Sequence, residues 1–355
     1  MNPSCSAFLR ALREPGVMAE FDMETWDRVV RQARAAGLLG RLGALASSFS
    51  KHLPEAVWRH LEAALTLAEQ QRRAVHWELR HLGRALERTE GPVVLLKGAA
   101  YAAADLAPAA GRIFTDIDLL VPRARLGATE SALMLDGWIT SPHDAYDLRY
   151  YREWMHELPP MRHLRRQTWL DLHHNILPET ARRKTQPALF MAASIALADF
   201  PRFSIPEPAD QVLHSATHLF HEGEWQHGLR DLVDLDALLR AYGAAPAFWP
   251  HLLARAETLN LGRPLYYALR YARRLLHTPI PEAAMANCPE RPGHLATALL
   301  DRLFLPAFAS AHADCRTGLS GPAAFMLFVR SHWLRMPIHL LLPHLLRKAF
   351  KADAK

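Results

Sequence analysis

Two aspartates stand inside an apolar run of the sequence, and they restrict the possible folds more than any other feature. In IFTDIDLLV, residues 113–121, strand alternation places Asp116 and Asp118 on one face and the intervening apolar side chains on the other. Strands are depleted in Asp because a buried carboxylate must be solvated or paired. A bound metal cation would supply that pairing, so the segment indicates a metal site on a buried strand.

A second strand with a carboxylate is predicted at QTWLDLHHNI, residues 167–176. Here Trp169, Asp171 and His173 share one face. If this strand lies beside the first, three carboxylates converge and repel one another unless divalent cations bind there. Carboxylate oxygens without thiolates suit Mg²⁺ or Mn²⁺. His173 could contact a phosphate, the metal or an acceptor, or be a half-buried structural imidazole.

The segment before the first acidic strand has the features of a phosphate site. Residues 93–96 form a short apolar strand after Gly-Pro, and a helix of little more than two turns is predicted at 99–107. Lys97 and Gly98 at the junction would offer a cation, free backbone N–H groups and close approach to a triphosphate. Arg112 could be a second phosphate clamp. Two structural alternatives remain: Asp118 could pair with Arg112 or Arg123, and Asp171 could cap a turn.

The remainder of the chain is predicted to be mostly helical, which gives an α+β fold. Apolar residues with helical 3-4 spacing run from 61 to 86, and similar spacing precedes them. A proline-rich stretch at 201–210 marks a boundary, after which helices follow, including 211–225 and 229–243. We expect a small mixed-sheet core at 91–200, between an N-terminal helical region at 1–90 and a C-terminal helical domain at 201–355.

Composition favours a cytoplasmic protein with anionic ligands. The net charge is +6, and Cys5, Cys288 and Cys315 are too few and too scattered for a disulfide framework. No signal peptide or spanning segment is evident. The apolar, basic stretch at 325–351 is interpreted as a pair of core helices broken at Pro337 and Pro343, in preference to a peripheral membrane contact.

Three segments resemble a known family: LLKGAAY at 95–101, GRIFTDIDLLV at 111–121 and LDLHHNI at 170–176. They are similar to the bacterial uncharacterised nucleotidyltransferases of the DNA polymerase β-type nucleotidyltransferase superfamily. The resemblance implies that Asp116 and Asp118 hold two metal ions, and that Asp171 completes the catalytic metal site and orients or deprotonates an acceptor hydroxyl. Where the superfamily commonly has Gly-Ser, this chain has Gly98-Ala99 and lacks a phosphate-binding hydroxyl, for which Lys97 could substitute.

The implied reaction moves a nucleoside monophosphate from a nucleoside triphosphate (NTP) to an acceptor hydroxyl, with release of pyrophosphate. The acceptor could be a small molecule, a peptide, a protein or tRNA. The alternatives are a non-catalytic nucleotide-binding or regulatory module of the same fold, and a tRNA-modifying toxin-type enzyme. The tRNA reading depends on two basic runs, although such runs are more often solvated faces: Arg162, Arg165 and Arg166, then Arg182, Arg183 and Lys184.

Histidines and one arginine downstream are further candidates for the substrate groove. His214, His218 and His221 fall on one helical stripe, which we interpret as a polar groove wall rather than a set of metal ligands. Arg230 is expected to pair with Asp231 and close the helical domain onto the site, although it could also reach a phosphate.

Overall fold

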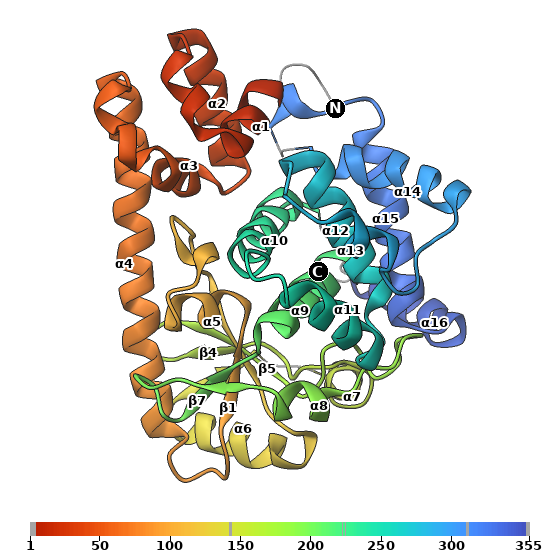
Figure 1. Cartoon of the computed structure of the whole chain (residues 1–355). Coiled ribbons are helices and arrows are strands. Elements are labelled where there is room, and N and C mark those ends of the chain that lie inside the picture. The colour runs from red at the N-terminus through yellow and green to blue at the C-terminus, as the bar shows by residue number, and fades with distance from the viewer. Residues whose placement is uncertain (1–4, 142–143, 222, 224, 310–311, 353–355) are drawn as a thin grey trace.

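The protein has a mixed seven-stranded sheet flanked by helices, which confirms the α+β prediction (Figure 1). The computed structural model describes residues 5–141, 144–221, 223, 225–309 and 312–352. The strand order is β3-β4-β5-β2-β1-β7-β6. The strands are β1 (Val93–Leu96), β2 (Asp116–Leu120), β3 (Trp138–Thr140), β4 (Met161–His163), β5 (Trp169–His173), β6 (Ile195–Ala196) and β7 (Phe203–Ile205). The sheet therefore extends beyond residue 200, because β7 pairs with β1.

The pairing at the centre of the sheet decides where the acidic residues lie. β2 is antiparallel to β1 and parallel to β5. In the parallel pair, Asp118 lies opposite Asp171. Residues opposite each other in neighbouring strands project to the same face of the sheet, so the two aspartates are neighbours on that face. The two acidic strands are therefore neighbours, which is the condition under which the sequence analysis expected their carboxylates to converge.

Both acidic strands are shorter than predicted, for reasons visible in the backbone. β2 begins only at Asp116, because the N–H of Phe114 donates to Gln71 of a helix instead of to the sheet. β5 begins only at Trp169, since Gln167 has a positive φ of 62° that turns the chain out of β4. The helix predicted at 99–107 is α5 (Lys97–Ala103), which ends before Asp105, another residue with positive φ.

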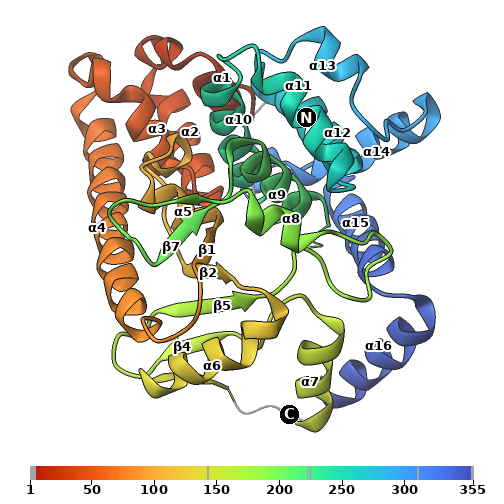
Figure 2. The ribbon, with the colours of Figure 1, turned by 60° about the horizontal axis from the view of Figure 1, so that its bottom comes forward.

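The N-terminal helices form a layer in which one long helix runs past the sheet and the three helices before it lie at its far end, away from the strands (Figures 1 and 2). They are α1 (Ser6–Arg13), α2 (Met23–Ala35), α3 (Leu39–Ala46) and α4 (Glu55–Ala85). The predicted long helix is α4, of 31 residues, which packs against α3, α5 and α6 (Leu126–Leu135). Its buried residues follow the predicted spacing, and Arg72, the residue outside that pattern, pairs with Glu69.

Two glycines allow the N-terminal helices to contact the loop that leads into β2. Gly40 in α3 meets Gly111, whose φ is +70°, and a Cβ added to Gly40 would lie 2.3 Å from the Gly111 carbonyl oxygen. No side chain fits between the two backbones. This contact fixes the backbone immediately before Arg112, one of the predicted site residues.

The C-terminal region is helical, as predicted, and its first helices are the ones nearest the sheet (Figure 1). Besides α5, three short helices connect the strands: α6, α7 (Ala145–Arg149) and α8 (Pro187–Ala192). The later ones are α9 (Pro208–His221), α10 (Gly228–Tyr242), α11 (Phe248–Thr258), α12 (Gly262–Leu276), α13 (Glu282–Ala286), α14 (His294–Ala307), α15 (Ser320–Arg335) and α16 (Ile338–Ala352). Glu222 and Glu224, near the end of the helix expected at 211–225, lie outside the described residues.

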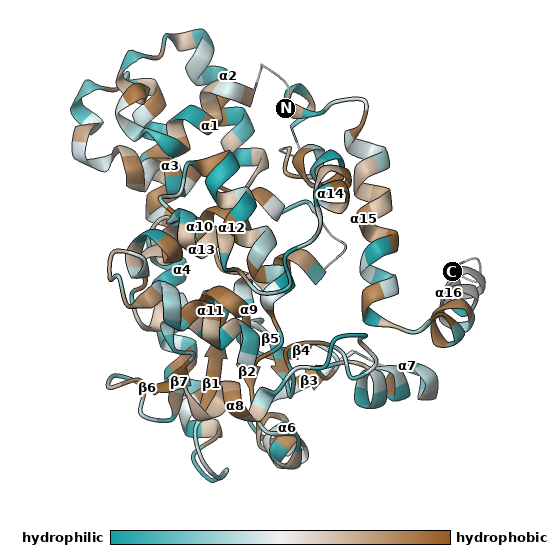
Figure 3. Cartoon of the chain, turned by 45° about the vertical axis from the view of Figure 1, so that its right-hand side comes forward, coloured by the Kyte–Doolittle hydropathy of each residue, from teal (hydrophilic) through white to brown (hydrophobic). Residues whose placement is uncertain are grey.

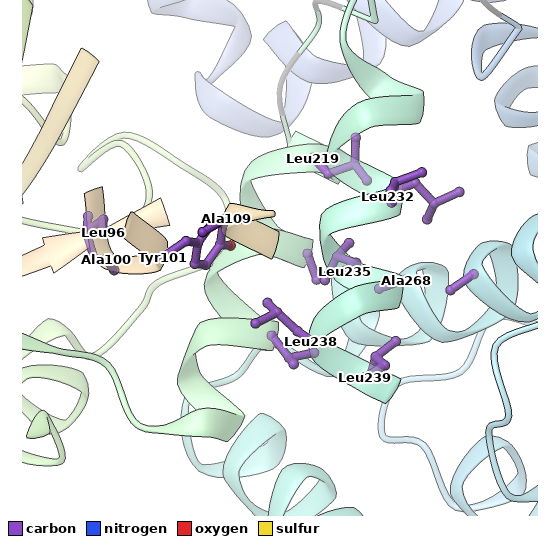
Figure 4. Packing of buried hydrophobic residues seen from close by; sticks show 14 of the residues in the cluster. Leu96, Ala100, Tyr101, Ala109, Leu219, Leu232, Leu235, Leu238, Leu239 and Ala268 are labelled. Atoms are coloured by element: carbon purple, nitrogen blue, oxygen red, sulfur yellow. The ribbon is translucent and has the colours of Figure 1, made fainter. Parts of the chain in front are cut away.

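Buried leucines of α10 pack between α5, which adjoins the sheet, and the outer helix α12. Figure 4 shows them between Tyr101 of α5 and Ala268 of α12. Leu235 and Leu238 are fully or almost fully buried, at 0% and 1% exposure. At about 25 cal/mol per Å² of buried apolar surface, each such side chain contributes roughly 1.5–3 kcal/mol to folding. α10 is therefore held firmly beside the sheet.

The interpretation of residues 325–351 as a pair of core helices is wrong. Pro337 does separate α15 from α16, but Pro343 lies inside α16. Large apolar side chains of α15 are exposed, among them Phe325, Met326, Val329 and Trp333. Hydrophobic segments of α14–α16 accordingly lie on the outside of the helical region (Figure 3). α16 instead reaches α7, where Arg347 pairs with Asp144 at 3.1 Å (Figure 2). Within the described part of the chain, no helix is both long and apolar enough to cross a membrane.

Arg166, from the first basic run, is part of a buried polar network and not of a solvated face. Its Nε lies 2.8 Å from Glu78 Oε1 of α4, and its Nη2 lies 2.8 Å from Asp136 Oδ2. Thr168 also donates to Glu78, whose side chain is only 2% exposed. The network ties α4 to the turn between β4 and β5.

We predict that Glu78→Ala lowers the free energy of unfolding by about 3–5 kcal/mol, because the guanidinium of Arg166 loses a buried partner. Chemical denaturation measures this value. Glu62→Ala, at an exposed position of the same helix, is the matched control and should change the value by no more than about 0.5 kcal/mol. Equal effects of the two substitutions would contradict a stabilising role for the network.

Candidate active site

A cavity of about 350 Å³ opens between the acidic strands and the C-terminal helices. It is lined by every site residue that the sequence predicted, except His214 and His221 of the histidine stripe. Six carboxylates line it, which outnumber its four lysine and arginine side chains. The carboxylates are Asp116, Asp118, Glu157, Asp171, Asp231 and Asp234, and the cations are Lys97, Arg112, Arg230 and Arg335. The excess of negative charge at the strands favours a cation as the first ligand.

Asp118 is the most buried of the three predicted acids, with 5% exposure. Its Oδ1 lies 3.0 Å from Nε2 of His173 and 3.8 Å from Nζ of Lys97. The proposed structural pairing of Asp118 with Arg112 or Arg123 is therefore wrong, and Arg123 pairs with Glu179 instead. Asp171 lies within β5 and does not cap a turn.

The two central aspartates have opposite electrostatic environments. Burial raises the pKa of Asp118, but the ammonium of Lys97 and the hydrogen bond from His173 outweigh burial and hold that pKa well below its usual range. Burial, together with the charge of Asp118, raises the pKa of Asp171 to about 7. Asp118 is thus a permanent anion, whereas Asp171 can exchange a proton near neutral pH.

His173 connects this pair to a group of potential metal ligands. Burial lowers its pKa, but the hydrogen bond to Asp118 and the charge of Glu157 raise it overall. Its Nδ1 lies 3.3 Å from Glu157 Oε2. Ligand atoms of His156, Glu157 and His173 all lie within 4.8 Å of one another, and in the described part of the chain only this trio is so compact. Asp116, Asp118 and Asp171 share the cavity but are more widely spaced.

His156 and Glu157 were missed by the sequence analysis. They lie in the loop before β4, and Glu157 forms an isolated bridge with His173. Their signal is an adjacent His-Glu pair in WMHELPP, one residue before two prolines. Without the fold, nothing connects that pair to β5.

The strand-helix junction differs from the predicted phosphate cradle. Lys97, not Gly98, has the positive φ, at 42°. An L-residue in this conformation costs roughly 1–2 kcal/mol, so the strain lies at a residue that contacts Asp118. Gly98 is needed for a different reason, because an added Cβ would lie 3.0 Å from the ring of Phe114.

Arg112 is held inside the protein by an acid of α10. It pairs with Asp234 and lies 5.7 Å from the centre of the Tyr101 ring. Burial, together with the nearby charge of Arg230, lowers its pKa. Arg112 therefore joins the loop before β2 to the helical domain, while its side chain still borders the cavity.

The predicted histidine stripe divides between different environments. His218 lines the cavity, which supports the groove-wall interpretation for this residue. His214 is buried, which lowers its pKa, and lies against the ring of Phe190. Burial lowers the pKa of His221 to about 3. Arg230 lines the cavity and forms the predicted pair with Asp231, at 2.9 Å.

A mixed sheet whose central strands carry acidic residues into a cavity closed by helices defines an α+β protein with an enzyme-like cleft. The model of a family described as uncharacterised nucleotidyltransferase matches residues 22–277. The chain belongs to this family, which supports a transferase with a general role in nucleotidyl transfer. Comparisons with curated proteins and with solved structures gave no match.

We predict that Asp171→Asn stabilises the metal-free protein at alkaline pH. The folded-state pKa of Asp171, about 7, lies above the ordinary value near 3.9, so its ionisation costs folding free energy as pH rises through that window. The variant should exceed the native protein by about 1–3 kcal/mol near pH 8 and by much less near pH 4.

Denaturation in the presence of a chelator, at both pH values, checks this difference. If Asp171→Asn destabilises the fold equally at the two pH values, the proposed electrostatic strain at Asp171 is absent.

Proposed function

We propose that the protein transfers a nucleoside monophosphate from an NTP to an acceptor hydroxyl, releasing pyrophosphate, and that a divalent cation is required. The observation that carries this proposal is the register of β2 and β5, which sets Asp118 beside Asp171 with Asp116 on the same face. Family membership agrees with it. We further propose the fold relationship to the DNA polymerase β-type superfamily on the basis of this strand arrangement.

The carboxylates of Asp116, Asp118 and Asp171 fit a hard cation, because they supply several oxygen donors. Neighbouring positive charges do not fully compensate the repulsion between these carboxylates. The charge of Asp118 contributes to the raised pKa of Asp171, which shows that repulsion. Asp116, Asp118 and Asp171 would hold Mg²⁺ or Mn²⁺. When bound, such a cation stabilises negative charge on the transferred phosphoryl group and the leaving pyrophosphate.

The protein's own side chains have separate roles in this proposal. Asp171 orients the acceptor hydroxyl or accepts its proton, because its carboxylate lies beside Asp118 in the cavity. Lys97, Arg112 and Arg230 border the cavity and bind the triphosphate by charge-assisted hydrogen bonds. Gly98 and Phe114 shape the adjacent wall, and His218 faces the acceptor side.

The acceptor could still be a small molecule, a peptide, a protein or tRNA. The basic runs give little support to tRNA, since Arg166 pairs with Glu78 and Arg183 pairs with Glu290. A non-catalytic module would retain nucleotide binding without the acids, so the three aspartates favour an enzyme over it.

We predict that Asp118→Asn abolishes label transfer from NTP. Each of the four NTPs, labelled at the α-phosphate, is incubated with Mg²⁺ and a lysate fraction as acceptor pool, and products are analysed by mass. Loss of the permanent anion should lower the rate by at least about 100-fold, as expected when a group that stabilises developing charge is removed.

Asp199→Asn removes an exposed carboxylate outside the cavity and is the matched control. NTP binding without transfer, unchanged by Asp118→Asn, would contradict the enzymatic proposal and support the binding module.

We predict that His156→Ala weakens the binding of Mn²⁺ much more than the binding of Mg²⁺. Imidazole is a better ligand for Mn²⁺ than for Mg²⁺, so a cation reached by His156, Glu157 and His173 should be Mn²⁺. The variant should lose Mn²⁺ affinity by about tenfold or more and change Mg²⁺ affinity much less. Electron paramagnetic resonance of free Mn²⁺, with Mg²⁺ as competitor, measures both constants. His52→Ala, at an exposed position, is the control, and equal losses for the two variants would exclude His156 as a ligand.

A further inference from the structure

A second cavity, of about 330 Å³, is adjacent to the first one, and more arginines than carboxylates line it. It is formed by the segment after β5, the end of α9, the start of α12 and the end of α15. Four guanidinium groups line it, against one carboxylate, that of Glu290. The four are Arg182, Arg183, Arg263 and Arg330.

The single carboxylate is already engaged. Glu290 Oε2 lies 2.8 Å from Nη1 of Arg183, and it also accepts from the backbone N–H of Arg263. Arg183 is further fixed by the carbonyl and side-chain oxygens of Asn260. Among the described residues, no carboxylate lies within ion-pair distance of Arg182, Arg263 or Arg330.

Two of these arginines are partly removed from water, and one of them has a buried nitrogen without a hydrogen-bond partner. Nε of Arg263 is buried and has no hydrogen-bond partner in the described structure. Arg330 donates to the carbonyl oxygen of Phe220 at 2.8 Å and lies between the rings of Tyr267 and Phe304, 5.6 and 5.5 Å from their centres. Burial lowers the pKa of Arg330, and the charge of Arg263 contributes to the same change. Partly buried charges of one sign that line the same cavity are costly unless an anion compensates them.

The positive charge of the cavity and the aromatic ring at its rim indicate which kind of anion it binds. His221 also lines it, but with a pKa of about 3 it is neutral and adds no charge. The arginines exceed the carboxylates by three, which matches a multiply charged phosphate better than a single carboxylate. Trp333 at the rim is partly exposed, and the guanidinium of Arg182 lies 3.9 Å from its ring centre. A planar group attached to the phosphate could contact the same rim.

We propose that this second cavity binds a phosphate group, either free or as a phosphate ester, through Arg263, Arg330 and Arg182. The site is distinct from the acidic cavity, although the two are adjacent: Arg335 of the first cavity donates to the backbone oxygen of His221, which lines the second. The proposal does not depend on the nucleotidyltransferase reaction.

Fluorine NMR of the full chain labelled with 5-fluorotryptophan tests the proposal at the site itself. The Trp333 resonance is assigned with Trp333→Phe, and inorganic phosphate, adenosine 5′-monophosphate and adenosine are titrated separately. Inorganic phosphate should shift the Trp333 resonance saturably. Arg263→Gln should weaken this binding about tenfold or more, the loss expected for one charge-assisted hydrogen bond.

Arg274→Gln is the matched control, because Arg274 lies on the same helix but is paired with Asp301 at 2.6 Å. It should leave the phosphate titration unchanged. Tighter binding of adenosine 5′-monophosphate than of phosphate identifies an ester as the ligand, and equal binding identifies free phosphate. The proposal is overturned if neither shifts the resonance, if adenosine alone shifts it equally, or if Arg274→Gln weakens binding as much as Arg263→Gln.

Discussion

The parallel register of β2 and β5 is the constraint on which the rest of the structure depends. It places two carboxylates side by side at the centre of a sheet, where a shift of one residue would turn one of them to the opposite face. The two carboxylates therefore repel each other, and the neighbouring charged groups compensate them unequally. Lys97 and His173 compensate Asp118, whereas Asp171 remains poorly compensated and has a raised pKa. A site that costs stability in the absence of ligand is expected where binding a cation is part of the function.

The helices on both sides of the sheet complete this site rather than merely covering the core. The Gly40–Gly111 contact holds the loop before β2, and the pair of Arg112 with Asp234 joins that loop to α10. α10 also brings Arg230 to the cavity, and its leucines are packed tightly on α9 and α12. In the proposed function, the sheet supplies Asp116, Asp118 and Asp171 for a cation. Positive charge for the anionic substrate comes from the start of α5, the loop before β2 and α10, through Lys97, Arg112 and Arg230.

The three central strands, β5, β2 and β1, and the aspartates on them could be predicted because short-range patterns determine them, whereas β3, β4, β6 and β7 were not predicted. Alternation fixed the common face of Asp116 and Asp118, and an Asp flanked by leucines identified β5. Contacts between distant segments could not be predicted in this way. Glu157 reaches His173 only through a bridge between a loop and a strand, and Arg166 looked like part of a charged surface until α4 supplied Glu78. The apolar sequence of α15 was typical of a core helix, but exposure depends on which face its neighbours cover, and Phe325 remains uncovered.

The most direct test is a crystal structure with Mn²⁺ and a non-hydrolysable NTP, in which anomalous scattering locates the metal. The account predicts a peak in contact with the carboxylates of Asp118 and Asp171, with the triphosphate extending toward Lys97 and Arg112. The result that would contradict it is the absence of any peak in contact with Asp118 or Asp171, even if a separate Mn²⁺ is bound by His156 and Glu157.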